Sequence, residues 1–295
     1  MIEATLDFLS AYSTLIALVG VNALLALSVW VTLYAGQLTL GNAAFMAVGA
    51  YVAALLERHL GTPFPLALAC GAAVAALVAV PLGLTVFRLR GVYLAIATLA
   101  FGEVLRVILL ATPITGGGQG LNGIPPTTEL WHIYLSLAVV AYVLWRVQGA
   151  TVGRAWAAVR EDEIAAASQG IAVRRYKLAA FVAGALVAGW AGGLSAHITF
   201  SIEPNDFAFG KAVQILVFAV VGGIPNPLGP IFGAALFTAL FTALPELLRP
   251  LKDYRDIFQG LVLLAVIIYL PRGLVTVSQL RRTRRLQQIG AADVA

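Results

Sequence analysis

Apolar residues run along this chain in long blocks, separated by short polar or glycine-rich stretches. A block of about 20 apolar residues can cross the hydrocarbon core of a bilayer as an α-helix. Helices are the expected form because backbone polar groups in lipid must be satisfied within the segment. The nine blocks lie at 12–34, 38–56, 64–87, 92–111, 130–147, 178–199, 211–223, 228–247 and 257–271. The pattern predicts an all-α, polytopic membrane protein with about nine transmembrane helices.

Two of these blocks are less regular, so the predicted span count ranges from eight to ten. Block 38–56 is rich in Gly, Ala, Asn and Thr, which suits a broken or re-entrant helix as well as a continuous one. Block 211–223 is short and runs into Gly-Gly-Ile-Pro-Asn-Pro at 222–227. Proline lacks the backbone donor that a helix needs, so we expect a turn or a pore-lining break there.

The composition supports a membrane protein and excludes some kinds of site. Only 11% of the residues are charged, whereas soluble domains are about a quarter charged. The single cysteine, Cys70, rules out an intramolecular disulfide and a cysteine metal cluster, and the three histidines are scattered. We therefore expect no metal site. The chain divides into a membrane domain at 1–275, with a charged loop at 148–177, and a basic tail at 276–295.

Basic residues near span ends predict the orientation, because they favour the cytoplasmic side. They gather in loop 146–177, at 88–90 and in the tail after residue 271, whereas loops 112–129 and 200–210 contain no Lys or Arg. Nine spans, with the N-terminus outside and the C-terminus cytoplasmic, put all three basic stretches inside. The exception is a mixed cluster that this orientation puts outside, formed by Glu246, Arg249, Lys252, Asp253, Arg255 and Asp256.

The charged loop predicts a short amphipathic helix. Residues 153–168 contain good helix formers without internal proline, and Gly170 follows as a stop signal. Such a helix could lie on lipid headgroups with Trp156 as its anchor. It could instead dock onto a soluble partner. Three adjacent acidic residues at 161–163 disfavour contact with an anionic membrane surface.

At this loop the sequence resembles a known family. The stretch 158–171 is similar to the EAA-type coupling segment of ABC importer permeases, in the form typical of branched-chain amino-acid permeases of the LivM type. Four more stretches resemble motifs of that family in the same order. They are 36–45 (G-x-x-S-L-G-H-A-A-F in the family), 89–103 (L-R-G-x-Y-L-A-I-x-T-L-x-F-G-E), 115–123 (T-G-G…N-G) and 221–230 (G-G-x-G-x-x-x-G-P). The chain departs from them at Thr39, at Asn42 and at 224–227.

The resemblance covers roughly residues 30–275 and implies a transmembrane permease subunit of an ATP-driven importer for branched-chain or related amino acids. It implies a bacterial cytoplasmic (inner) membrane location. The implied partners are a homologous second permease, two cytoplasmic ABC ATPase subunits and an extracytoplasmic substrate-binding protein, with membrane lipids around them and no nucleic acid. The chain lacks a Gly-rich phosphate loop followed by Lys-Ser/Thr. We therefore expect no cofactor on this chain, and ATP hydrolysis in the partner subunits rather than here.

Two groups of candidate site residues follow. The resemblance implies an ATPase-coupling interface, with polar contacts from four residues and close approach at two small ones: Arg160, Glu161, Asp162, Glu163, Ala166 and Gly170. Candidates for the substrate pathway or a subunit interface are Gln37, Asn42, Phe45, Glu103 and Arg106. Glu103 and Arg106 are spaced i, i+3, close enough to pair. The small polar stretch 41–45 could line a path or allow tight packing, and we expect His197 at the membrane interface.

The main rival function is a stand-alone secondary transporter or channel for small organic solutes. Such a protein would couple ions through intramembrane acidic residues. Glu103 is the candidate, but Arg106 lies beside it. A membrane enzyme is disfavoured because no paired carboxylates, histidine cluster or Ser/His arrangement converge on one plane. The substrate stays open among branched-chain amino acids, urea, amides and aromatic acids.

Overall fold

The computed structural model describes the backbone of residues 13–247 and the side chains up to residue 240. Eight of the nine predicted blocks fall within this part, and each coincides with one helix. These helices are α2 (Ser13–Tyr34), α3 (Asn42–Leu60), α4 (Phe64–Val86), α5 (Val92–Ala111), α6 (Leu130–Gly149), α9 (Val173–Thr199), α10 (Phe209–Gly222) and α11 (Leu228–Leu247). The predicted span 257–271 and the tail 276–295 lie outside the described residues.

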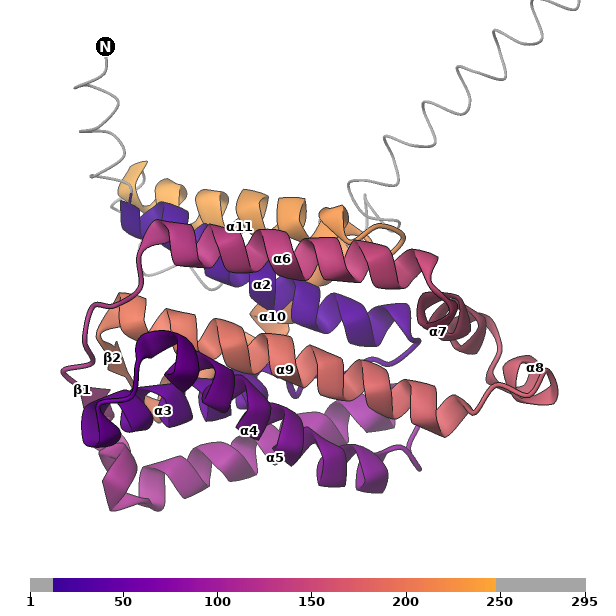
Figure 1. Cartoon of the computed structure of the whole chain (residues 1–295), viewed down its shortest axis with the longest axis horizontal. Helices are drawn as coiled ribbons and strands as arrows, with labels where there is room; N and C mark the ends of the chain where they lie inside the picture. The colour runs from indigo at the N-terminus through magenta and orange to yellow at the C-terminus, as the bar shows by residue number, and fades with distance from the viewer. Residues whose placement is uncertain (1–12, 248–295) are drawn as a thin grey trace, which may run out of the picture.

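Six of these helices, α2 to α6 and α9, are long and apolar enough to cross a membrane, and α10 is shorter. Together they form the bundle of an all-α, polytopic membrane protein (Figure 1). The predicted irregularity in block 38–56 lies before α3 rather than inside it. The chain from Ala35 to Gly41 is not helical: a turn is followed by residues without regular structure, and α3 is continuous from residue 42 to residue 60.

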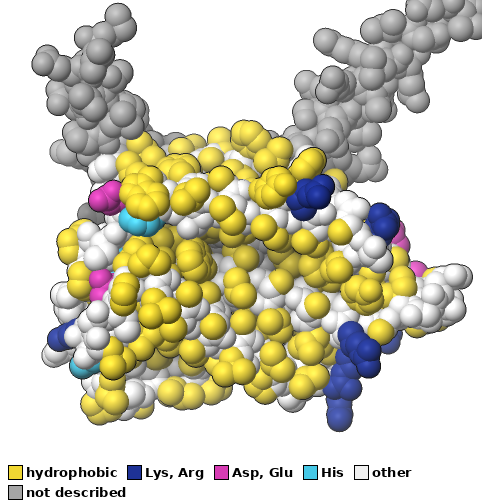
Figure 2. Space-filling model, viewed as in Figure 1, with side chains coloured by type: hydrophobic (Ala, Val, Ile, Leu, Met, Phe, Trp, Pro, Cys, Tyr) yellow, Lys and Arg dark blue, Asp and Glu magenta, His cyan; other side chains and the backbone are white. Residues whose placement is uncertain are grey.

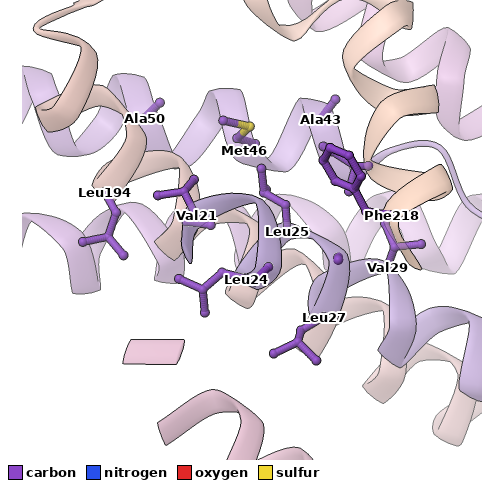
Figure 3. Close-up of a cluster of buried hydrophobic side chains, with 14 of the residues drawn as sticks. Val21, Leu24, Leu25, Leu27, Val29, Ala43, Met46, Ala50, Leu194 and Phe218 are labelled. Carbon is purple, nitrogen blue, oxygen red and sulfur yellow. The ribbon is translucent and has the colours of Figure 1, made fainter. Parts of the chain in front are cut away.

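The core of the bundle is built on α3, α4 and α9, which pack backbone to backbone. A Cβ atom added to Gly49 of α3 would lie 2.0 Å from the carbonyl oxygen of Gly189 on α9, and one added to Gly71 of α4 would lie 2.7 Å from the carbonyl oxygen of Gly49. Small residues allow such close approach in lipid, where dispersion contacts drive helix association. Beside them, α2 contributes a fully buried apolar face that packs on Met46 and Phe218 (Figure 3).

The bundle has two different ends. At the end that we call the charged end, two short helices follow α6: α7 (Thr151–Glu161) and α8 (Glu163–Ser168). Most of the Lys and Arg side chains visible in Figure 2 lie at this end, and apolar side chains cover the middle of the face. The predicted basic stretches 88–90 and 146–177 meet here, because Arg90 lies 3.9 Å from Glu163.

At the opposite end, which we call the ribbon end, the two loops without basic residues pair. The strands β1 (Leu121–Asn122) and β2 (Ser201–Ile202) form a short antiparallel ribbon. Three 3-10 turns surround it: η1 (Pro113–Thr115), η2 (Gly117–Gln119) and η3 (Pro204–Phe207). The loops thus lie together at one end, as their shared lack of basic residues predicts, and the ribbon connects the α5–α6 loop to the α9–α10 loop.

Candidate functional site

The charged loop forms two helices instead of the single helix that its sequence predicts. The backbone of Asp162 is extended, with φ −155° and ψ 114°, so α7 ends before it and α8 starts after it. The Asp162 carboxylate accepts hydrogen bonds from the backbone N–H groups of Ile164 (2.8 Å) and Ala165 (3.1 Å). Aspartate is a strong N-cap because it satisfies free donors at a helix start. A continuous helix was therefore the wrong expectation: capping by Asp162 outweighs the helix-forming tendency of its neighbours.

The predicted stop at Gly170 is confirmed. Gly170 has φ +81°, the left-handed region that glycine favours. Its N–H donates to the carbonyl of Ala167 and the N–H of Ile171 donates to the carbonyl of Ala166, the Schellman arrangement of helix ends. A Cβ atom at Gly170 would meet no atom of the chain within 4 Å. Glycine is therefore needed for its left-handed backbone conformation and not because a side chain would clash.

Two contacts hold this two-helix segment, residues 151–171, against α9. The Glu163 carboxylate forms an ion pair with Lys177 of α9, in which Lys177 is buried and Glu163 is partly exposed. The indole N–H of Trp156 donates to the carbonyl of Tyr176 at 2.9 Å, and the Trp156 side chain is buried. The Trp156 side chain thus packs within the protein and does not anchor the segment in lipid. We call residues 151–171 the coupling segment from here on, after the role that the sequence resemblance implies for them.

A third contact joins the coupling segment to α2. The guanidinium carbon of Arg160 lies 5.3 Å from the centre of the Tyr34 ring, within the range of cation–π attraction. The adjacent Gly36, with φ +76°, leaves no room for a side chain: a Cβ atom there would lie 2.9 Å from the Cα of Arg160. The last turn of α7 is therefore packed directly on the chain that leaves α2.

The remaining face of α8 is open. Ile164 is 75% exposed, and the small residues Ala165 and Ala167 beside it are exposed too. Glu161 is also exposed and pairs with Arg160 at 3.3 Å. Ala166 is buried within the chain, so its small size serves the packing of α8 on its own protein. Ile164 was missed as a site residue, although an isoleucine beside three acidic residues is a signal that could have found it.

The candidate pathway residues near the α2–α3 connection are all buried. Asn42 belongs to a network of polar side chains, donating to Ser28 Oγ at 2.9 Å and accepting from Thr39 Oγ1 at 3.2 Å. Gln37 is 1% exposed, and neither atom of its side-chain amide has a hydrogen-bond partner among the described residues. Unpaired buried amides are rare in proteins.

The other pathway candidates lie in different surroundings. Phe45 packs in the core, with its ring edge-to-face on Phe181 at 5.4 Å. Glu103 and Arg106 form an ion pair on α5, 2.8 Å between Oε2 and Nε, as their spacing predicts. Arg106 also donates to the side-chain oxygen of Asn205 at 2.9 Å, which ties α5 to η3. Both charged side chains are partly exposed. The structure does not bring Phe45 or this ion pair into one site with the coupling segment.

One buried pair was not predicted. His197 of α9 is fully buried, two residues before the helix ends at Thr199. Its Nε2 lies 2.5 Å from Oε2 of Glu57 on α3, and its Nδ1 lies 2.7 Å from the carbonyl oxygen of Gly193. Both ring nitrogens thus face acceptors, so a proton must lie between Nε2 and the carboxylate. Glu103 is therefore not the only acidic residue within the bundle. The partners are 140 positions apart, so no local pattern connects them.

Comparison with known proteins assigns the chain. Residues 11–267 match the model of a family described as the permease component of branched-chain amino acid transport systems. The chain is 34% identical to the high-affinity branched-chain amino acid transport system permease protein LivM of Escherichia coli K12, over 88% of this chain and 67% of the relative; the figures for LivM of Salmonella typhimurium LT2 are the same.

A more distant relative is the autoinducer 2 import system permease protein LsrC of Enterobacter sp. strain 638. It is 29% identical over 70% of this chain and 64% of the relative. No solved structure matches the chain. The motifs, the helical bundle and these matches agree: the chain is a multi-pass membrane protein that belongs to the family of permease components of branched-chain amino acid transport systems.

Proposed function

We propose that this chain is one transmembrane subunit of an ATP-driven importer for branched-chain or related amino acids in the inner membrane. In this proposal a homologous permease completes the pathway, two ABC ATPase subunits supply the energy, and a binding protein delivers the substrate from outside. The positive-inside rule makes the charged end cytoplasmic. The ribbon end then faces the binding protein.

The main support for this proposal is the set of contacts that the coupling segment makes. It is tied to α2 through Arg160 and Tyr34 and to α9 through Glu163 and Lys177. It also presents an exposed apolar side chain, Ile164, among small residues. An element that is fixed to two helices of the bundle and open on its other face can transmit the movement of a docked partner as a rigid-body shift.

The roles within the coupling segment follow from their contacts. Ile164 and Glu161 are free to meet the ATPase, since both are exposed. Asp162, Glu163 and Ala166 hold α8 in place, and Gly170 ends it. Arg160 passes the movement to the end of α2. The predicted coupling interface is thereby divided into a docking face and a set of residues that attach that face to the bundle.

The second candidate is a stand-alone secondary transporter, which the buried Glu57–His197 pair favours because its shared proton could couple to transport. One experiment separates the two functions. The chain is co-expressed with its partner subunits, reconstituted into liposomes and supplied with leucine-loaded binding protein. If the chain is an importer subunit, leucine uptake will require ATP inside the liposomes. If this chain alone takes up leucine without ATP, driven by a proton or sodium gradient, the chain is a secondary transporter and not an importer subunit.

A further inference from the structure

A partly buried lysine lies where α2, α10 and α11 meet. Lys211 is in the first turn of α10, and its ammonium lies 3.5 Å from the side-chain oxygen of Asn22 on α2. The amide nitrogen of Asn22 donates in turn to Thr238 Oγ1 of α11 at 3.0 Å. The side chains next to position 22, including Val21 and Leu24, are apolar and buried (Figure 3). Three helices thus place a small polar group within an apolar interface.

Lys211 lacks an ion-pair partner among the described side chains. The ammonium carries three donors, and its one hydrogen bond within the described part of the chain is the long contact to Asn22. Asp206 on η3 acts on it electrostatically but does not lie within ion-pair distance. Lys177, by contrast, is buried against a carboxylate. A cation among spanning helices is costly and typically marks a substrate or ion path. Within the described part of the chain, no carboxylate lies at ion-pair distance from the Lys211 ammonium.

Lys211 is itself partly exposed, in the first turn of a short helix. The 14 residues of α10 extend about 21 Å, at about 1.5 Å per residue, which is shorter than the roughly 30 Å of a hydrocarbon core. The chain before it, through β2 and η3, is not α-helical, and such backbone is tolerated at membrane depth where it lines a cavity or is covered by protein. Phe209 and Gly210, directly before Lys211, are exposed. Transporters often place the start of a broken helix at the anionic group of their substrate.

We propose that Lys211, oriented by Asn22, receives the carboxylate of the amino-acid substrate as it passes through the permease. The proposal rests on the function proposed above and names the residue that recognises the substrate class. Every α-amino acid carries a carboxylate at neutral pH, because the pKa of that group lies near 3.5. A single cation on the path would therefore serve a set of apolar amino acids that differ in their side chains.

The test measures ATP-driven uptake of radiolabelled leucine by the complete complex in liposomes. Lys211→Met should lower uptake by about tenfold or more, the size expected when a charge-assisted hydrogen bond is lost. Lys211→Arg keeps the charge and should remain within about threefold of the unaltered complex. Assembly with the partner subunits, measured by co-purification, should be unchanged in both. Lys211→Gln, which keeps a donor without the charge, replaces Lys211→Met if that variant does not assemble.

A double variant separates substrate binding from a structural role. If Lys211 served only to balance Asp206, then Lys211→Met combined with Asp206→Asn would restore uptake, and the proposal would be wrong. If Lys211 binds the substrate, the double variant stays defective. Normal uptake by Lys211→Met alone would also overturn the proposal while leaving the importer intact. Absence of ATP-driven uptake in the unaltered complex would instead refute the proposed function itself.

Discussion

The guanidinium carbon of Arg160 lies 5.3 Å from the centre of the Tyr34 ring. This contact joins the last turn of α7 to the last residue of α2, and α2 is the most deeply buried of the long helices. A force applied to the coupling segment would therefore reach the centre of the bundle directly. The neighbouring Gly36 keeps the two backbones in contact because no side chain separates them.

Replacing Gly36 should uncouple the coupling segment from α2. In Gly36→Ala the new Cβ atom would lie 2.9 Å from the Cα of Arg160, and the positive φ adds strain on the order of 1 kcal/mol. We expect ATP-driven uptake to fall by at least about fivefold, the order that a loss of about 1 kcal/mol produces. Uptake and ATP hydrolysis are measured on the same liposomes.

The matched control is Gly61→Ala, because Gly61 also has a positive φ, +58°, but a Cβ atom there would meet nothing within 4 Å. It carries the same backbone strain without the contact with α7. Equal losses in the two variants would mean that strain alone causes the defect, and the contact between α7 and α2 would have no part in coupling.

The ion pair between Glu163 and Lys177 should attach α8 to α9. Glu163→Lys places two ammonium groups together and should abolish coupled uptake, because a partly buried pair is strongly destabilised when one partner is removed. The double variant that combines Glu163→Lys with Lys177→Glu should recover a substantial part of the coupled uptake. Uptake in the two single variants and in the exchanged pair is compared. If the exchange stays as defective as the singles, Glu163 acts through the ATPase and not through Lys177.

The role of Asp162 in starting α8 can be tested by removing the two hydrogen bonds that its carboxylate accepts. Asp162→Ala removes both acceptor contacts and should destabilise α8 by about 1 kcal/mol, whereas Asp162→Asn, which keeps a capping oxygen, should lose much less. Hydrogen exchange at the amides of Ile164 and Ala165 reports this directly, and it should accelerate in Asp162→Ala. Unchanged exchange there would show that the cap does not hold the start of α8.

The sequence predicted the helices well and the contacts between them poorly. Long apolar blocks are local signals, so each block within residues 13–247 could be assigned to a helix. The break at Asp162 was missed because its neighbours favour a helix and the cap depends on one extended residue. The Glu57–His197 pair could not be seen, because it depends on how α3 and α9 pack. Ala166 is buried within its own chain, which could not be predicted because it depends on which face of α8 packs on the bundle.

The Glu57–His197 pair gives a prediction about stability. In Glu57→Gln the side-chain amide can donate to Nε2 of a neutral imidazole, so the bond survives without a shared proton. Glu57→Leu leaves the buried imidazole nitrogen without a partner, which costs about 1–3 kcal/mol. The melting temperature of the purified protein in detergent should therefore fall clearly in Glu57→Leu and little in Glu57→Gln. A Glu57→Leu variant as stable as the original would show that the pair contributes nothing to the fold.

Docking of an ATPase subunit on the exposed face of α8 is the core of the proposed function, and site-specific cross-linking can detect it. The chain has one cysteine, so Cys70→Ser leaves this chain without a thiol. In this background Ile164→Cys, at a position that is 75% exposed, is labelled with a thiol-reactive benzophenone and irradiated in the complete complex. Leu60→Cys, at a 69% exposed position at the ribbon end, is the control. We expect an adduct with the ATPase subunit from Ile164→Cys and none from Leu60→Cys. Adducts with lipid alone at Ile164→Cys, or an ATPase adduct at Leu60→Cys, would show that the ATPase does not dock on this face of α8.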